Sequence, residues 1–333
     1  MKETIIVSFS GGETSGNMCK WLLDNYGHLY YFVFVFANTG REHEETLIFV
    51  DKCDREFGLQ LVWIEAVTSP IKGMGTKHKI VNFKTACRDG SVFEDFIKKE
   101  GIPNTSRQHC TTRLKTRPIR HWMKQEGLVW CKTAIGMRSD EPNRIISSKK
   151  RELLEFLSLN PHIWRLQNRS DRNEQLDELG CGYHGMTKDQ IKTFKSLYNH
   201  NEYDCIYPMN DWEELDKQDV NTFWESQGFR LNLPSHLGNC TTCFKKSDNK
   251  LYRIAHESPE YFRWNLEMDE KYSGVNAGKN DRHVFFRKKR DTKALVGDAM
   301  QQDLTRLIFM TTSDRDKSAG CSESCNGFSD EDE

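Results

Sequence analysis

This 333-residue sequence has neither a long apolar run nor an excess of charge of one sign. Its 48 basic and 49 acidic residues leave a formal net charge of −1. That balance excludes a uniformly basic nucleic-acid-binding protein and an acidic disordered chain. The longest apolar run, 29–37, suits a buried strand and is too short to cross a bilayer. The first residues lack the basic region, apolar core and cleavage site of a signal peptide. We therefore expect a cytoplasmic protein with no membrane partner.

The first third of the sequence alternates strand and helix patterns. Short β-rich runs at 4–9, 29–36 and 59–64 are separated by helical apolar spacing at 14–26 and 44–57. The order β-α-β-α-β predicts an α/β fold with a doubly wound, parallel, Rossmann-like sheet. Later patterns predict an irregular stretch at 65–92, a strand at 133–137, and helices near 92–100, 216–227 and 250–256.

A glycine-rich segment, SFSGGETSG at 8–16, separates the first strand from the first helix. Glycines let backbone N–H groups approach phosphate oxygens, and a helix N-terminus adds positive potential. The alternative is an ordinary turn in which Thr14 or Ser15 caps the helix. Because strand, loop, helix and following strands agree, we favour a phosphate-binding loop. It is neither a Walker loop nor a GxGxxG dinucleotide loop, because it lacks both spacings.

Three further motifs follow in order: Ala37–Gly40 (ANTG), Cys110–Pro118 (CTTRLKTRP) and Gly136–Glu141 (GMRSDE), with Gly238–Cys243 (GNCTTC) as a fourth. Together with the SGG loop they resemble the PAPS reductase-like family. This family groups phosphoadenosine phosphosulfate reductase relatives, many from phages or mobile elements, within the ATP-pyrophosphatase (adenine nucleotide alpha hydrolase-like) superfamily. The resemblance covers residues 4–256. It implies an enzyme that cleaves ATP between the α and β phosphates and adenylates a substrate.

The resemblance also assigns roles by position. The residues that would hold the β and γ phosphates are Ser8, Ser10, Gly11, Gly12, Thr14 and Ser15. Asn38 and Thr39 would face the adenosine, and Gly136 would let the backbone pass the nucleotide. The expected catalytic residues are Arg113, Lys115, Arg138 and Asp140, although a solvated basic helix face is the alternative for 113–124. Mg²⁺ would accompany ATP, because pyrophosphate is a tetra-anion.

Two details bear on the ligand. The superfamily loop usually reads SGGxDS, and Thr14 stands here where a carboxylate is expected. PAPS reductases themselves carry a loop poorer in paired glycines and end in a Glu-Cys-Gly-type tail, which this sequence lacks. The paired glycines and the missing tail favour ATP over PAPS, whereas Thr14 favours the hypothesis of a non-catalytic nucleotide-binding regulator.

Eleven cysteines are many for a cytoplasmic chain, and two close pairs among them suggest chemistry. Cys240 and Cys243 form a CxxC pair with the spacing of metal ligands, and Cys110 supplies a third ligand in the family motif. Such a set resembles the 4Fe-4S cluster of sulfur-transferring ATP pyrophosphatases that thiolate tRNA, and the DNA phosphorothioation enzyme of the family. Zinc, with His109 or His236 as a fourth ligand, is the alternative.

The second pair, Cys321 and Cys325, lies on a polar tail that ends SDEDE. A cysteine on such a tail could act as a sulfur carrier or as a reductant, or it could be an incidental exposed thiol. We divide the chain into a PAPS reductase-like nucleotide-binding domain (1–230), a cysteine-bearing helical subdomain (231–312) and a mobile acidic tail (313–333).

Basic runs at 113–124, 149–151 and 287–290 can supply phosphate contacts, which makes tRNA or DNA a candidate substrate. A sulfur donor or reductant protein is a further candidate partner, and the sequence leaves the oligomeric state open. The favoured function is an ATP pyrophosphatase that adenylates a substrate for sulfur transfer at an iron–sulfur cluster. A PAPS reductase that attacks with Cys325 and a non-catalytic nucleotide-binding regulator are the alternatives.

Overall fold

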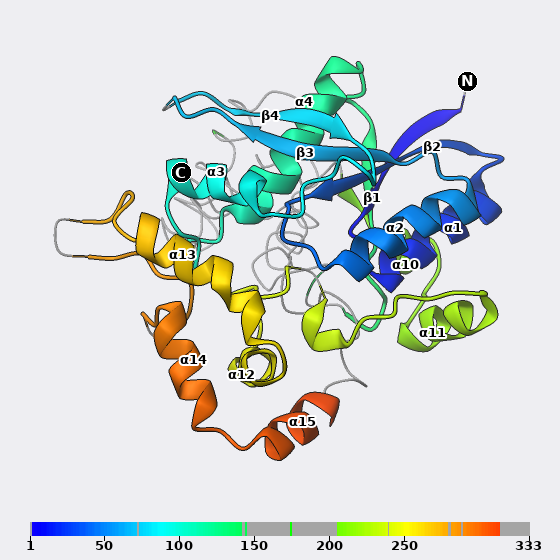
Figure 1. Cartoon of the computed structure of the whole chain (residues 1–333). Coiled ribbons are helices and arrows are strands. Elements are labelled where there is room, and N and C mark those ends of the chain that lie inside the picture. The colour runs from blue at the N-terminus through cyan, green and yellow to red at the C-terminus, as the bar shows by residue number, and fades with distance from the viewer. Residues whose placement is uncertain are drawn as a thin grey trace.

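The computed structural model describes residues 2–71, 73–141, 144, 174, 205–238, 240–278, 281–287 and 289–313. Six strands form one sheet in the order β4-β3-β2-β1-β5-β6 (Figure 1). They are β1 (Glu3–Phe9), β2 (Tyr30–Asn38), β3 (Val62–Thr68), β4 (Thr76–Val81), β5 (Lys132–Ile135) and β6 (Cys205–Ile206). All pairs are parallel except β3 with β4, so the predicted α/β fold is confirmed.

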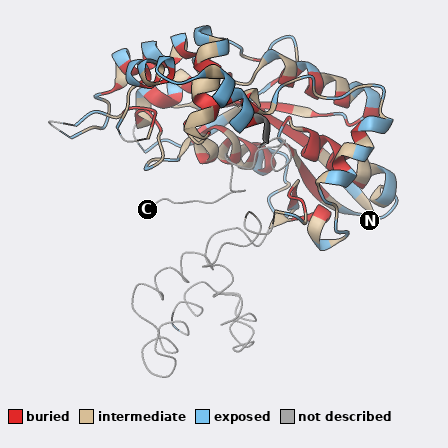
Figure 2. Ribbon diagram, turned by 90° about the horizontal axis from the view of Figure 1, so that it is seen from below, coloured by how far each residue is buried: buried red, intermediate tan, exposed pale blue. Residues whose placement is uncertain are grey.

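Strand β2 shows why its sequence reads as one continuous apolar run. Phe34 and Phe36 pack into a hydrophobic cluster with α1 (Glu13–Tyr26) and α2 (Glu44–Phe57) on one face of the sheet. Val35 and Ala37 pack on the other face against Trp122 of α4 (Arg117–Gln125). A parallel strand covered on both faces needs apolar residues at every position. Figure 2 shows the resulting buried layer along the central strands.

The remaining helical elements flank the sheet or follow it in the chain. They are α3 (Ser91–Glu100), the π-helical turn η1 (Thr112–Thr116), α10 (Pro208–Asp211), α11 (Lys217–Ser226), η3 (Ser235–Leu237), α12 (Asp248–Glu257), η4 (Pro259–Phe262), α13 (Arg263–Tyr272), α14 (Thr292–Met300) and α15 (Leu304–Ser313). Among the described residues, no helix combines the length and apolarity that a membrane span requires.

The stretch 65–92, expected to be irregular, is where the prediction was wrong. Strand β3 continues to Thr68, four residues beyond its predicted end at Ile64, and β4 pairs with it antiparallel. The β4 sequence TKHKIV carries two lysines and lies at the sheet edge, where charged residues discourage pairing with another chain. Because the β4 sequence is mostly polar, an apolar sequence pattern did not detect this strand.

The C-terminal helices share a core with the middle of the chain. One hydrophobic cluster joins Phe96 of α3 and Leu114 of η1 to Leu251 of α12, Met268 of α13 and Leu295 of α14. In Figure 1, α13 lies beside α3, and α14, in orange, lies beyond α13. The cysteine-bearing region therefore packs on the sheet-bearing part of the chain through α3 and η1. The predicted acidic tail, with Cys321 and Cys325, falls almost wholly outside the described residues.

Candidate functional site

The glycine-rich loop connects the end of β1 to the start of α1, as the sequence predicts. Gly12 is the N-cap of α1, and no side chain caps that helix end. Ser15 instead braces the loop, because its Oγ accepts from the Ser10 backbone N–H at 3.1 Å and donates to the Gly12 carbonyl at 3.0 Å. The first-turn N–H groups of α1 therefore face no capping side chain, which is the arrangement that binds anions.

Two glycines in and beside this loop leave no room for a side chain. Gly11 has φ +87°, and a Cβ there would lie 2.8 Å from Thr46 Cγ2. A Cβ on Gly136, just after β5, would lie 3.1 Å from the Cα of Ser15. Strands β2 and β5 flank β1 on opposite sides, so this loop lies at the switch point where doubly wound sheets bind ligands.

Arg138 links the loop to the predicted acidic residue. Its guanidinium is only 1% exposed and donates to Asp140 Oδ1 at 2.8 Å and to Thr14 Oγ1 at 3.3 Å. Glu141 lies 3.5 Å from the same guanidinium. The structure thus brings Thr14, Arg138 and Asp140 together. The guanidinium fixes the first turn of α1 through Thr14, and Asp140 and Glu141 balance its charge.

A second cluster lies at the end of β2 and joins two more motifs. Thr39 donates from its backbone N–H to Glu42 Oε2 at 2.9 Å, and its hydroxyl lies 3.6 Å from Cys240 Sγ. Lys115 Nζ, on the π-helical turn, lies 3.7 Å from Glu42 Oε1. Burial, followed by the charge of Glu42, raises the pKa of Cys240 to about 12. Single-turn π-bulges of this kind are frequent at functional sites.

Asn38 faces the other way and is fully buried. Its amide donates to Glu65 Oε1 at 2.7 Å and to the Cys87 carbonyl at 2.9 Å, while its Oδ1 accepts from the Gly40 N–H. The predicted contact with adenosine would use the remaining lone pair of Oδ1 or replace one of these bonds. In this structure Asn38 instead organises the loop around Cys87.

Two more of the predicted residues have other contacts in the structure. Arg113 Nε is 3.4 Å from Glu100 Oε1. Ser8 lies within β1, opposite Val35 and Ile135 of the neighbouring strands. Cys325 falls outside the described residues.

The predicted metal ligands do not form a metal site in the described part of the chain. No group of three or more His, Cys, Asp or Glu side chains there could hold a metal ion. Cys110 and Cys240 both pack against the hydrophobic cluster of the C-terminal helices. His236, a candidate zinc ligand, is paired with Glu257 at 2.9 Å. In the described residues, these side chains are therefore not gathered as a ready ligand set for an iron–sulfur cluster or for zinc.

The tryptophans, whose rings could stack on bases, and the predicted basic runs differ in their exposure and contacts. Trp122 and Trp224 are buried in the core, whereas Trp130, between α4 and β5, is 92% exposed. In the RKKR run, Arg287 donates to the Lys245 carbonyl at 3.0 Å and so braces the chain. Residues 149–151 lie outside the described residues.

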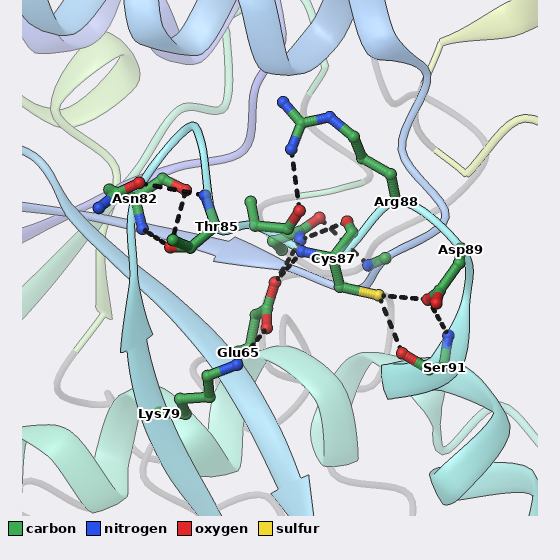
Figure 3. Close-up of polar contacts among 11 residues, drawn as sticks. Glu65, Lys79, Asn82, Thr85, Cys87, Arg88, Asp89 and Ser91 are labelled. Carbon is green, nitrogen blue, oxygen red and sulfur yellow. Dashed lines mark hydrogen bonds and ion pairs between the residues drawn. The ribbon is translucent and has the colours of Figure 1, made fainter.

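Sequence reasoning missed two residues of the sheet edge, Glu65 and Cys87. Glu65 is 2% exposed, and its Oε1 also accepts from the Cys87 N–H at 2.6 Å (Figure 3). The available signal was one carboxylate inside the otherwise apolar run 61–67 (LVWIEAV). A charge in a buried strand requires a partner and therefore marks a site to examine.

Comparison with known proteins agrees with this geometry. The family described as "Phosphoadenosine phosphosulfate reductase domain" matches residues 4–232. The "Uncharacterized nin region protein ORF290" of Escherichia phage lambda is 25% identical over 335 residues, covering 97% of this chain and 94% of that protein. No solved structure shows a significant match. The chain belongs to the phosphoadenosine phosphosulfate reductase domain family, and a phage protein is among its relatives.

Proposed function

We propose that this protein binds ATP at the loop between β1 and α1 and cleaves it between the α and β phosphates to adenylate a substrate. The observation that carries the proposal is the uncapped first turn of α1, which follows paired glycines and lies beside Gly136. Backbone N–H groups there can bind phosphate oxygens without a Walker lysine.

The surrounding residues suit the charges of this reaction. Arg138 donates to Thr14 and so positions the first turn of α1, whose N–H groups would hold the negative charge. Lys115, 3.7 Å from Glu42, provides a cation at the end of the neighbouring strand β2. Cleavage between the α and β phosphates leaves the adenylate on one side and pyrophosphate on the other. The N–H groups, positioned through Arg138, would stabilise the departing pyrophosphate.

Sulfur transfer is the less supported part of the hypothesis. The cysteine spacing predicts an iron–sulfur cluster, but the described side chains do not converge on a metal. No step of the proposed cleavage therefore uses a cluster. Anaerobic purification with iron, zinc and sulfide analysis tests the cluster separately. Sulfur transfer to tRNA or DNA remains a hypothesis for pyrophosphate assays with each nucleic acid.

ATP binding by calorimetry and pyrophosphate release test the main proposal. Gly136→Ala should weaken ATP binding about tenfold, about 1.4 kcal/mol, because its Cβ would push on the Ser15 backbone 3.1 Å away. Gly297→Ala is the matched control. No atom lies within 4 Å of that added Cβ, so ATP binding should not change, and the helix should gain about 1 kcal/mol.

Three outcomes separate the candidate functions. Pyrophosphate release that depends on a second substrate supports the adenylating enzyme. Sulfite release from PAPS, lost in Cys325→Ser, would replace it with the reductase. Tight ATP binding without turnover on tRNA, DNA or small acceptors would indicate a nucleotide-binding regulator. No ATP binding at all would overturn the proposal.

A further inference from the structure

A cavity of about 610 Å³ opens at the end of β3, beside β4 and the first turn of α3. Its wall includes Glu65 of β3, Lys79 of β4 and Cys87, Arg88 and Asp89 of the connecting segment (Figure 3). The glycine-rich loop lies two strands away, because β2 separates β3 from β1. Neighbouring strands are about 4.8 Å apart, so the two places are separated by about 10 Å along the sheet edge.

Glu65 is a buried carboxylate with one oxygen available to the cavity. Its Oε1 accepts from Asn38 Nδ2 and from the Cys87 N–H, which fixes the side chain. Among the described residues, the one charged neighbour of its Oε2 is the Lys79 ammonium, at 3.8 Å, beyond hydrogen-bond distance. The Lys79 side chain is 60% exposed and extends along the edge strand. A buried carboxylate is stabilised by a cation at closer range than this.

The other charged residues of the described wall do not supply a closer cation for Glu65. Arg88 is committed elsewhere, because it donates to Glu44 Oε2 at 2.7 Å and to the Ala86 carbonyl at 2.8 Å. Asp89 and Asp95 add two more carboxylates to the described wall. The backbone N–H of Ser91, followed by the thiol of Cys87, lowers the pKa of Asp89 to about 2 and keeps it anionic. Among the described wall residues, negative charge therefore exceeds positive charge.

We propose that this cavity binds the protonated amino group of a small amine, with Glu65 Oε2 as the anchoring acceptor. The Lys79 ammonium occupies the approach to that oxygen and is displaced by the ligand. An ammonium within 3 Å of Oε2 would form the charge-assisted hydrogen bond that Lys79 does not reach. The protonated nitrogen only anchors the ligand, because it carries no lone pair with which to attack phosphorus, and the amine site does not rest on the proposed function.

Cys87 provides a reporter for the test, because its thiol lies in the cavity wall. Alkylation of Cys87 by neutral iodoacetamide is followed by peptide mass spectrometry with butylammonium, or with butyramide as the neutral control. The Cys110 peptide serves as internal reference. We expect butylammonium to slow alkylation of Cys87 at least threefold and butyramide to leave it unchanged.

Two substitutions should change the protection of Cys87 by butylammonium in opposite directions. Glu65→Gln keeps an oxygen for Asn38 and the Cys87 N–H but removes the charge, and should abolish protection by butylammonium. Lys79→Met removes the competing ammonium and should give the same protection at several-fold lower amine concentration. A purely structural role for Glu65 would not produce the second effect. Thermal melts establish that both variants are folded.

A ligand-observed NMR titration of butylammonium with the same three proteins repeats the comparison without using the thiol. Equal binding of butyramide, no amine binding by the wild type, or unchanged binding in Glu65→Gln would overturn the proposal. ATP calorimetry on the same preparations separates the two hypotheses. If the protein binds ATP but no amine, the amine-binding proposal alone is rejected. If it binds the amine but no ATP, the proposed function alone is rejected.

Discussion

Two regions of one sheet edge, the loop after β1 and the cavity at the end of β3, have opposite chemical character. The loop is built from glycines, hydroxyls and backbone N–H groups, and its one carboxylate, Glu13, is paired with Arg230 at 2.9 Å. The cavity is built around the carboxylate of Glu65. The first therefore suits an anion and the second a cation. A parallel sheet brings both to its carboxyl edge, because all its parallel strands end there.

Strand β2 lies between these regions and serves both. Asn38, its last residue, turns toward Glu65, whereas the next residue, Thr39, turns toward Glu42 and Cys240. Successive side chains of an extended chain point to opposite sides, so two adjacent residues separate the two environments. This division explains how one short motif contributes to both regions.

The largest effect is expected from removing the cavity carboxylate. Glu65→Leu leaves the Cys87 N–H, and one proton of the Asn38 amide, without an acceptor inside the protein. An orphaned buried donor costs about 1–3 kcal/mol, so we expect a loss of about 3 kcal/mol in the free energy of unfolding. Urea unfolding measures it. Glu65→Gln, which retains an acceptor oxygen, should lose less than about 1 kcal/mol. Equal stability of the Leu and Gln variants would show that these hydrogen bonds do not determine the effect.

A smaller effect, on ATP affinity, is expected from placing a carboxylate in the glycine-rich loop, as the cavity has at Glu65. Thr14→Asp restores the carboxylate that the superfamily loop usually carries, and Arg138 Nη1, now 3.3 Å from Thr14 Oγ1, can pair with it. The added charge should repel ATP and weaken binding about fivefold without Mg²⁺, about 1 kcal/mol. With Mg²⁺ the affinity should recover, because the cation bridges carboxylate and phosphate oxygens.

Thr14→Asn is the control, since it adds a similar side chain without charge. Calorimetry with and without Mg²⁺ on the three proteins gives the comparison. A metal dependence that is the same for Asp, Asn and Thr would contradict a phosphate position beside residue 14.

The sequence predicted the glycine-rich loop well because its physics is local. Paired glycines between a strand and a helix define the turn within nine residues, and the helix pattern at 44–57 coincides with α2. The predicted strand at 4–9 and helix at 14–26 each begin one residue after the observed elements. Local sequence periodicity was therefore sufficient to predict the elements around the glycine-rich loop.

The cavity could not be predicted in the same way, because its contacts join distant segments. Glu65 meets Asn38 and Cys87, which are 27 and 22 residues away. The strand prediction also ended at Ile64, one residue before the carboxylate, because a charge breaks an apolar pattern. Similarly, the CxxC spacing indicated a metal, but spacing alone does not show where a third ligand lies.

The smallest expected effect concerns the anionic rim of the cavity and its pH dependence. Asp89 Oδ1 accepts from the Ser91 N–H at 2.9 Å and from the Cys87 thiol at 3.1 Å, which lowers the pKa of Asp89 to about 2. The folded-state pKa lies below the ordinary value of about 3.9. The charged form therefore stabilises the fold above pH 4, and this contribution is lost as the pH falls through about 2.

Asp89→Asn keeps the hydrogen bond from Ser91 but removes the charge at the start of α3. We expect a loss of about 0.5 kcal/mol at pH 7, typical of a carboxylate at an exposed helix N-terminus. That difference should shrink as the pH falls from 5 to 3, because the unfolded chain then takes up a proton at this position while Asp89 in the folded chain stays charged. Urea midpoints at pH 7, 5 and 3 measure the difference. Asp95→Asn is the control, since Asp95 accepts from the Lys98 ammonium at 3.0 Å. If the Asp89 and Asp95 variants show the same pH profile, the rim carboxylate is not held by the helix end, and the cavity loses one source of its fixed negative charge.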